Sequence, residues 1–222
     1  DTVSAANFPT ASGNSTLTDR GDDVVITPTD LGGGEVGQGE THACLKLSLF
    51  TPLDASTWTA VTVSPIGNLA PGSLDSAQVY LDGGDGVFDA GLDTLISPGI
   101  TTFTGGSAAI TLSAAQVITE TAKDYFLVLV VDVAATIGNT TGVRIHHPGH
   151  LTFSVPDPSS GTFPLSGTVS TVAAPDIVTG SRTDLAPELI GQGAGYATQR
   201  LSFITDGNNA SMTAIRVTKA GT

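Results

Sequence analysis

The stretch TDLGGGEVGQGETHACLKLSLFTPLDASTWTAVTVSPIGN, residues Thr29–Asn68, occurs twice in this chain. It returns as TDLAPELIGQGAGYATQRLSFITDGNNASMTAIRVTKAGT, residues Thr183–Thr222. The two copies align without a gap at an offset of 154 residues (183 − 29), and 14 of the 40 positions are identical. Self-similarity at a fixed period decides architecture before any other signal. We therefore expect one whole repeat and the opening part of another.

Within the repeated stretch, apolar and polar residues alternate as they do in a β-strand. In the first copy the apolar positions between Thr41 and Phe50 are Ala43, Leu45, Leu47 and Leu49. A period of two indicates a strand that buries one face. Further along, Val61 and Val63 align with Ile215 and Val217, and Trp58 aligns with Met212. These positions are predicted to point into a core, with Trp58 as a large apolar plug.

The rest of the chain continues in the same manner. Further strand candidates are residues 77–81, 108–113, 123–133, 142–147 and 150–155. Residues 125–133, YFLVLVVDV, are apolar on both faces and predict a central strand, and a short helical turn is expected at 113–120. Short strands about ten residues apart, separated by the 27 Gly and 12 Pro, predict an all-β fold of the Ig-like antiparallel β-sandwich type.

The repeat also predicts the domain boundaries. Residues 22–175 are expected to form a complete sandwich, and residues 176–222 the first strands of a second, incomplete one. Residues 1–21 are interpreted as the terminal strand or linker of a preceding or partner domain, because Phe8-Pro9 with Ser12-Gly13 resembles Phe163-Pro164 with Ser166-Gly167. Alone, the second copy would leave apolar strand edges uncovered. Either a continuing chain or a neighbouring subunit is expected to complete it.

Composition limits the possible partners and the cellular location. The net charge of −13, with 21 acidic and 8 basic residues, excludes a nucleic-acid partner and favours either simple solubility or cation binding. The single cysteine, Cys44, cannot form an internal disulfide and is interpreted as a small structural residue. No apolar run is long enough to insert into a membrane. The abundance of Thr and Ser and the start at Asp1 predict an exported, extracellular or cell-surface protein.

The stretch with the most chemical character is DGGDGVFDAGLD, residues Asp82–Asp93. Calcium prefers six to eight oxygen ligands, often from aspartates in a glycine-rich loop. The predicted ligands of a structural Ca²⁺ ion are the side chains of Asp82, Asp85, Asp89 and Asp93 and the carbonyl of Val87. The spacing departs from a common calcium pattern, because Asp82 lies three residues before Asp85. The alternative is an acidic hairpin turn without an ion.

Other candidate sites are weaker. The three histidines of HHPGH, His146, His147 and His150, could hold zinc or copper, but adjacent residues of a strand point to opposite faces and Pro-Gly is a plain turn. The run Gly32–Gly34 becomes Ala186-Pro187-Glu188 in the second copy, so it is a permissive loop rather than a phosphate cradle. No catalytic motif is present, and the chain is predicted not to be an enzyme. Glycosylation sequons occur at Asn14, Asn139 and Asn209.

The order of these segments resembles a known family. The succession of the GQG turn, TWTAVTV, the aspartate–glycine loop, AAITLS, YFLVLVVDV, GNTTGVRI and PDP…FP is similar to tandem Ig-like repeats of long secreted or surface proteins of bacteria and archaea. The resemblance implies extracellular, non-enzymatic structural modules, often with a calcium loop before a central strand.

Together these features predict a structural subunit of an extracellular filament or surface assembly. Copies of the chain would join head to tail, by strand complementation or by tandem continuation, and calcium would stabilise each unit. The alternative is an adhesin-type binding module of a large surface protein. One Trp and three Tyr are few for the aromatic platform that a sugar-binding module uses.

Overall fold

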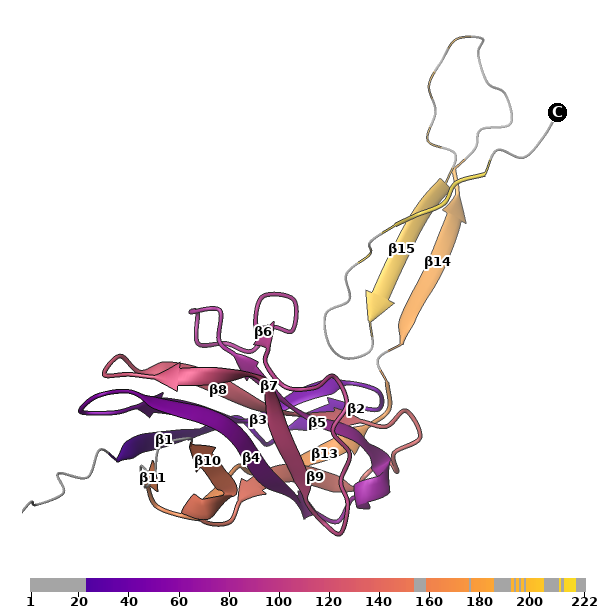
Figure 1. The fold of residues 1–222 in the computed structure, drawn as a ribbon. Helices are drawn as coiled ribbons and strands as arrows, with labels where there is room; N and C mark the ends of the chain where they lie inside the picture. The colour runs from indigo at the N-terminus through magenta and orange to yellow at the C-terminus, as the bar shows by residue number, and fades with distance from the viewer. Residues whose placement is uncertain are drawn as a thin grey trace, which may run out of the picture.

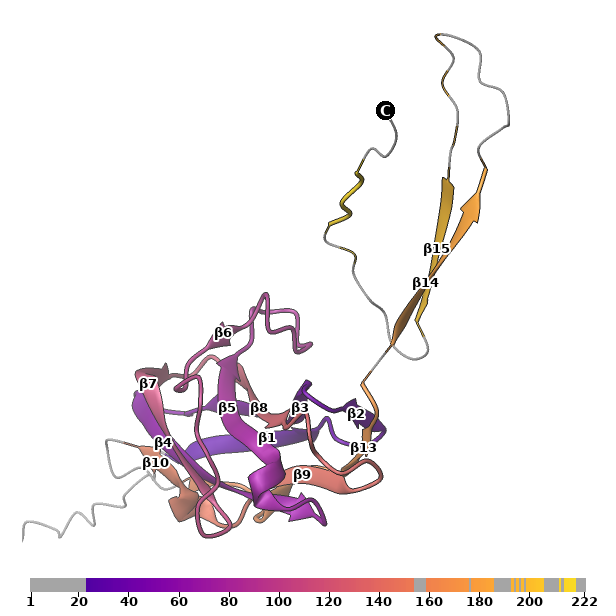
Figure 2. The same ribbon diagram turned by 90° about the vertical axis from the view of Figure 1, so that its right-hand side faces the viewer.

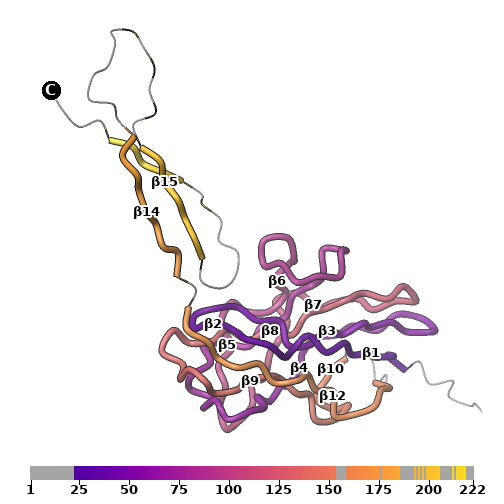
Figure 3. The backbone as a smooth tube through the Cα atoms, turned by 180° about the vertical axis from the view of Figure 1, so that it is seen from behind, coloured from indigo at the N-terminus to yellow at the C-terminus, as the bar shows by residue number. Residues whose placement is uncertain are grey.

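The computed structural model describes residues 23–153, 159–175, 177–185, 193, 195, 197, 199–205, 212 and 214–218. Between residues 23 and 175, two β-sheets pack face to face around one apolar core (Figures 1 and 2). A separate two-stranded sheet follows along the chain and lies outside the sandwich (Figure 3). The predicted all-β sandwich fold is therefore confirmed.

The first sheet has six strands. In spatial order they are β11 (Ser159–Ser160), β1 (Val24–Asp30), β3 (Thr41–Phe50), β8 (Lys123–Val131), β5 (Leu74–Leu81) and β6 (Thr94–Leu95). All neighbouring strands are antiparallel except β1 and β11, which run parallel.

The second sheet has seven strands. Its main path is β10 (Leu151–Phe153), β4 (Ser56–Gly67), β9 (Thr140–Ile145), β13 (Ser170–Ala173) and β2 (Glu35–Gly37), while β7 (Ala108–Ile118) pairs with β4 and β12 (Leu165–Ser166) with β9. Only β13 and β2 run parallel. Short 3₁₀ turns are η2 (Pro71–Ser73) and η3 (Pro148–His150). The third sheet consists of β14 (Val178–Asp184) and β15 (Gln199–Thr205).

The predicted helical turn at residues 113–120 is wrong. Strand β7 continues to Ile118, and its last residues pair with the start of β4. The pairing of β7 with β4 shifts in register between Trp58 and Ala60 and then continues to Ile118. This pairing overrides the local preference for a turn.

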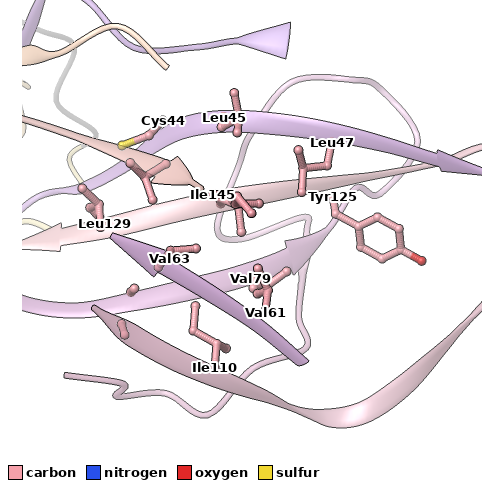
Figure 4. Close-up of a cluster of buried hydrophobic side chains, with 14 of the residues drawn as sticks. Cys44, Leu45, Leu47, Val61, Val63, Val79, Ile110, Tyr125, Leu129 and Ile145 are labelled. Atoms are coloured by element: carbon pink, nitrogen blue, oxygen red, sulfur yellow. The ribbon is translucent and has the colours of Figure 1, made fainter. Parts of the chain in front are cut away.

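The alternation predicted for residues 41–50 holds except at one position. Leu45, Leu47 and Leu49 are buried in the core, but the β3–β8 register shifts between Ala43 and Leu45. As a result Cys44 enters the core and Ala43 packs on the opposite face of the sheet. Figure 4 shows Leu45, Leu47, Val79 and Leu129 of the first sheet among Val61, Val63, Ile110 and Ile145 of the second.

Trp58 fills the core as predicted from its alignment with Met212. Its side chain is fully buried, and its ring meets Tyr125 edge-on at a centroid distance of 5.0 Å. The indole Nε1–H donates a hydrogen bond to the carbonyl of Ala60 at 2.8 Å. A buried tryptophan needs such a partner for its one polar atom, so the site suits this residue.

Strand β8 is the central strand that the sequence predicts. It pairs with β3 on one side and β5 on the other. Tyr125, Leu127 and Leu129 face the main core. Phe126 and Val128 face outward and form a second apolar cluster with Tyr80, to which Phe88 adds its ring. Both faces are therefore covered.

The glycine-rich run after β1 closes against the end of the sandwich. A Cβ atom on Gly32 would lie 1.9 Å from the carbonyl oxygen of Thr168, so only glycine fits there. The backbone N–H groups of Gly32 and Thr168 donate to Asp30 Oδ1 at 2.9 and 2.8 Å, and the Thr168 hydroxyl donates to Asp30 Oδ2. Burial raises the pKa of Asp30, but the hydrogen bonds from Thr168 and Gly32 outweigh it and lower the pKa overall.

A partly buried junction beside this run links three segments. The His42 Nε2 atom lies 2.7 Å from Ser170 Oγ, and this hydroxyl also accepts a hydrogen bond from Gly33 N–H at 3.0 Å. Burial lowers the pKa of His42 below its ordinary value of 6.5, and the charge of Glu40 raises it in part. The folded protein therefore favours the neutral imidazole at this junction.

Stability is expected to fall as the pH is lowered through 6.5, the ordinary pKa of histidine. The unfolded chain takes up the proton first, so the free energy of unfolding decreases as pH falls. Urea unfolding at about pH 7.5 and about pH 5.5, where carboxylates stay ionised, measures the change. His42→Gln should make the free energy of unfolding depend less steeply on pH, and the dependence that remains comes from the other histidines. An identical slope in this variant would contradict the assignment.

Candidate functional site

The aspartate–glycine loop, residues 82–93, connects β5 to β6. Its carboxylates bind backbone N–H groups of the same loop. Asp82 accepts hydrogen bonds from Gly84 and Gly86, and Asp85 accepts one from Val87. Gly84 and Gly86 have φ angles of 109° and 76°, a conformation that favours glycine. The glycines thus allow the tight wrapping that brings the carboxylates together.

Three of the four predicted aspartate ligands converge. Asp82, Asp85 and Asp93 each offer a carboxylate oxygen, and these oxygens all lie within 4.8 Å of one another. Asp93 is 8 % exposed and accepts hydrogen bonds from the N–H groups of Gly83 and Asp89, each at 2.8 Å. Carboxylates this close repel one another unless a cation lies between them. The arrangement is suited to a hard divalent cation such as calcium.

The other two predicted ligands are placed differently. Asp89 lies outside the group of three, and its Oδ1 accepts a hydrogen bond from Gly91 N–H at 2.7 Å. Val87 lies two residues after Asp85, and its side chain is exposed.

The loop is anchored to the sandwich by Phe88. Its ring meets Tyr80 and Phe126 edge-on, at centroid distances of 5.1 and 5.6 Å. Burial raises the pKa of Tyr80, and the charge of Asp93 adds to the rise. The sequence around Phe88 does not predict this contact, because Phe126 is distant in sequence. The apolar outward face of β8 indicates only that some side chain must cover it.

The three histidines gather at one corner instead of pointing apart. The ring centroids of His147 and His150 are 3.9 Å apart, and those of His146 and His150 are 6.0 Å apart. His146 and His147 lie beyond β9, which ends at Ile145, so the strand alternation behind the expectation of opposite faces does not apply to them. Burial and the charges of His147 and His146 lower the pKa of His150. Within the described residues, Asp82, Asp85 and Asp93 are the only group of three or more potential ligands whose ligand atoms lie close enough together to share a metal ion.

Of the three sequons, Asn139 lies in the described part of the chain, in the turn between β8 and β9, where it is partly exposed. Asn14 and Asn209 lie outside the described residues. Glycosylation at all three stays a prediction.

The second candidate site is the β14–β15 hairpin, which copies the β1–β3 pair of the sandwich. In the sandwich, residues 25–30 pair with residues 50–45, from Val25↔Phe50 to Asp30↔Leu45. In the hairpin, residues 179–184 pair with residues 204–199, from Thr179↔Ile204 to Asp184↔Gln199. Adding the offset of 154 to each first-copy pair gives the second-copy pair. Gly39 and its equivalent Gly193 also share a φ of 79°.

The two copies differ in what covers them. Leu47 is 0 % exposed and Leu201 is 44 % exposed, although the two are the same residue at the same position of the repeat. The same contrast holds for Val63 and Val217, at 1 % and 83 %, and for Trp58 and Met212, at 0 % and 65 %. Among the described residues, β15 pairs with β14 alone, whereas β3 pairs with β1 and β8. The hairpin thus presents the inner surface of a sandwich to solvent.

These features define an all-β sandwich protein with an acidic loop and a second, uncovered copy of its first hairpin. None of the helices in the described part of the chain has the length and hydropathy of a membrane span.

Comparison with solved structures finds several similar chains, two of which are the following. One belongs to a complex of CaDoc0917 with CaCohA2; it is 14 % identical, with a TM-score of 0.29 over 68 % of this chain and 98 % of that one. The other belongs to the sixth cohesin of scaffoldin B from Acetivibrio cellulolyticus, in complex with a Cel5 dockerin mutant; it is 18 % identical, with a TM-score of 0.31 over 68 % of this chain and 97 % of that one. At these values the likeness carries no functional argument, and the fold class rests on the strand pairing described above.

No protein-family model matches the chain, and no curated protein matches it.

Proposed function

We propose that this protein is a structural module of an extracellular filament or surface assembly. Ig-like sandwiches would join head to tail, and strands of a neighbouring module would complete the second copy. The observation that carries the proposal is the β14–β15 hairpin, which repeats β1–β3 pair by pair. Its apolar side chains, including Leu201 and Phe203, are exposed. Exposed strand edges and apolar faces of this kind attract another chain.

The proposal assigns a role to each part of the chain. Residues 22–175 form one complete module, and residues 176–222 begin the next. Residues 1–21, which lie outside the described residues, belong to the end of a preceding or partner module. The partner is a module of the same kind, because the hairpin repeats β1 and β3, and these strands are covered by other strands of the same sandwich in the complete module.

Calcium belongs to the same proposal as a structural ion. The converging oxygens of Asp82, Asp85 and Asp93 support it, with Asp89 and the carbonyl of Val87 as further ligands from the same loop. The ion would neutralise part of the net charge of −13 and hold the loop against the outward face of the first sheet. Neighbouring acidic modules would then repel one another less.

The test is the mass of the full chain in solution with calcium. Sedimentation velocity over a range of concentrations should show a mass that rises above the 22.3 kDa of one chain. Phe203→Asp should lower the association at least about tenfold, because a charge cannot enter an apolar interface without a large cost. Ile137→Asp is the matched control, since Ile137 is about as exposed as Phe203 but lies on the complete sandwich. A mass that stays at 22.3 kDa at every concentration would refute the proposal.

A further inference from the structure

The free edge of β15 repeats part of the β3 edge that pairs with β8 in the first copy. Five of the eight β3–β8 pairs lie after the register shift: Leu45↔Leu127, Lys46↔Phe126, Leu47↔Tyr125, Ser48↔Asp124 and Leu49↔Lys123. The equivalent residues of β15 are Gln199, Arg200, Leu201, Ser202 and Phe203. Within the described residues no strand occupies this edge.

The charged position is the most specific feature of that edge. In the sandwich, Lys46 Nζ lies 3.1 Å from Asp124 Oδ2, and both side chains are partly buried. Arg200 takes the place of Lys46 in the hairpin, and Ser202 takes the place of Ser48, which lies opposite Asp124. The second copy thus keeps the cation that binds an acidic residue on the neighbouring strand. A guanidinium also binds a carboxylate with two parallel hydrogen bonds.

The apolar positions of β15 point to the same kind of neighbour. Leu201 keeps the residue that lies opposite Tyr125, and Phe203 replaces Leu49 with a larger apolar group. The chain's own β8 cannot serve this edge, because it is already paired with β3 and β5 and is covered on both faces. The neighbour must therefore be a strand of the same type from another module.

We propose that the free edge of β15 binds an antiparallel strand with the chemistry of β8, supplied by another module of this repeat. An acidic residue of that strand lies opposite Ser202 and pairs with Arg200, and an aromatic residue lies opposite Leu201. Backbone hydrogen bonds supply affinity, and the ion pair and the aromatic position set the register. This inference rests on the proposed assembly and names the strand that performs it.

The test uses a fluorescent peptide with the sequence of residues 121–133, TAKDYFLVLVVDV, and a lysine tail for solubility, added to the full chain. A scrambled peptide with the same tail controls for non-specific attraction to the acidic protein. We expect the β8 peptide to bind at least about tenfold more tightly than the scrambled one, because only the β8 sequence places an acidic residue opposite Ser202 and an aromatic residue opposite Leu201. Equal binding of the two peptides, or no binding of either, would overturn the inference.

Charge reversal tests the assigned ion pair. The peptide with Asp124→Lys should bind the unaltered chain about fivefold more weakly, since opposite charges on neighbouring strands attract and like charges repel. The Arg200→Glu chain should reverse the order and prefer the altered peptide. Absence of this reversal would overturn the assigned register.

Disulfide formation measures the register directly. A Ser202→Cys chain should cross-link fastest to a peptide with its one cysteine at position 124, and more slowly to peptides with cysteine at 122 or 126. The native thiol does not compete, because Cys44 is buried and burial raises its pKa to about 12. Self-association without binding of the β8 peptide would refute this inference and leave the proposed function standing. Peptide binding by a chain that stays monomeric would refute the proposed function and leave this inference standing.

Discussion

Leu47→Ala is expected to lower the free energy of unfolding by about 2–5 kcal/mol, while Leu201→Ala is expected to cost less than about 0.5 kcal/mol in the dilute chain. The two substitutions remove the same atoms from the same position of the repeat. They differ in surroundings, because Leu47 is enclosed between the two sheets of the sandwich and Leu201 is 44 % exposed. Comparing the two variants therefore isolates the effect of burial, because the residue, the substitution and the position in the repeat are the same.

The physical basis is the cavity left by the truncated side chain. Leu47 lies opposite Tyr125 of β8, whose ring packs against Trp58, so the core cannot collapse freely onto the missing atoms. Leu201 faces solvent, so its truncation exposes little new apolar surface. Chemical denaturation of the full chain at low concentration measures both values.

Self-association should change only one of the two results. At high concentration Leu201→Ala should become more costly, since the proposed interface buries that side chain. Leu47→Ala should cost the same at both concentrations. An equal cost for both variants in the dilute chain would mean that the hairpin is covered within one chain, which contradicts the proposed function.

Calcium is expected to raise the melting temperature by about 5–10 °C at a free concentration near one hundred times its dissociation constant. Such an excess stabilises the folded state by about 2.7 kcal/mol, and for a chain of this size each kcal/mol shifts the midpoint by about 2–4 °C. The ion relieves repulsion among Asp82, Asp85 and Asp93, whose carboxylate oxygens converge. A chelator should reverse the shift, as followed by differential scanning calorimetry.

Single substitutions assign the ligands. Asp85→Asn should abolish most of the calcium shift, because Asp85 belongs to the convergent group and its exposed side chain makes only one hydrogen bond in the loop, to Val87 N–H. Asp89→Asn should have a smaller effect, since Asp89 lies outside that group. Asp75→Asn, at an exposed position of β5, is the matched control and should keep the full shift. No shift in the unaltered chain would remove the calcium proposal.

Several elements could be predicted because they depend on short-range patterns. Strand β3 has the bounds that its alternation predicts, and β8 has two apolar faces as its sequence indicates. The acidic loop was visible from its aspartates and glycines. Where pairing with a distant strand mattered, the predictions were less accurate. Strand β7 extends along β4 instead of turning, and the bulge opposite β8 exchanges Ala43 for Cys44 in the core.

The candidate sites show the same division. The four aspartates were found from spacing, but only the folded loop shows that Asp93 joins Asp82 and Asp85 while Asp89 does not. The alignment of the two copies was found from identity. The equal strand register of the two hairpins appears only in the structure.

The sequence by itself determined that this chain is built from strands, that its first hairpin is repeated after 154 residues, and which faces of those strands are apolar. These properties follow from the two-residue period of a strand and from residue identity, both of which are local. Only the tertiary structure decided how deeply each side chain of the two copies is buried. Leu47 and Leu201 have the same side chain, but β8 and the second sheet cover only the first. Burial depends on what the rest of the chain brings to that face, and no local pattern contains that information.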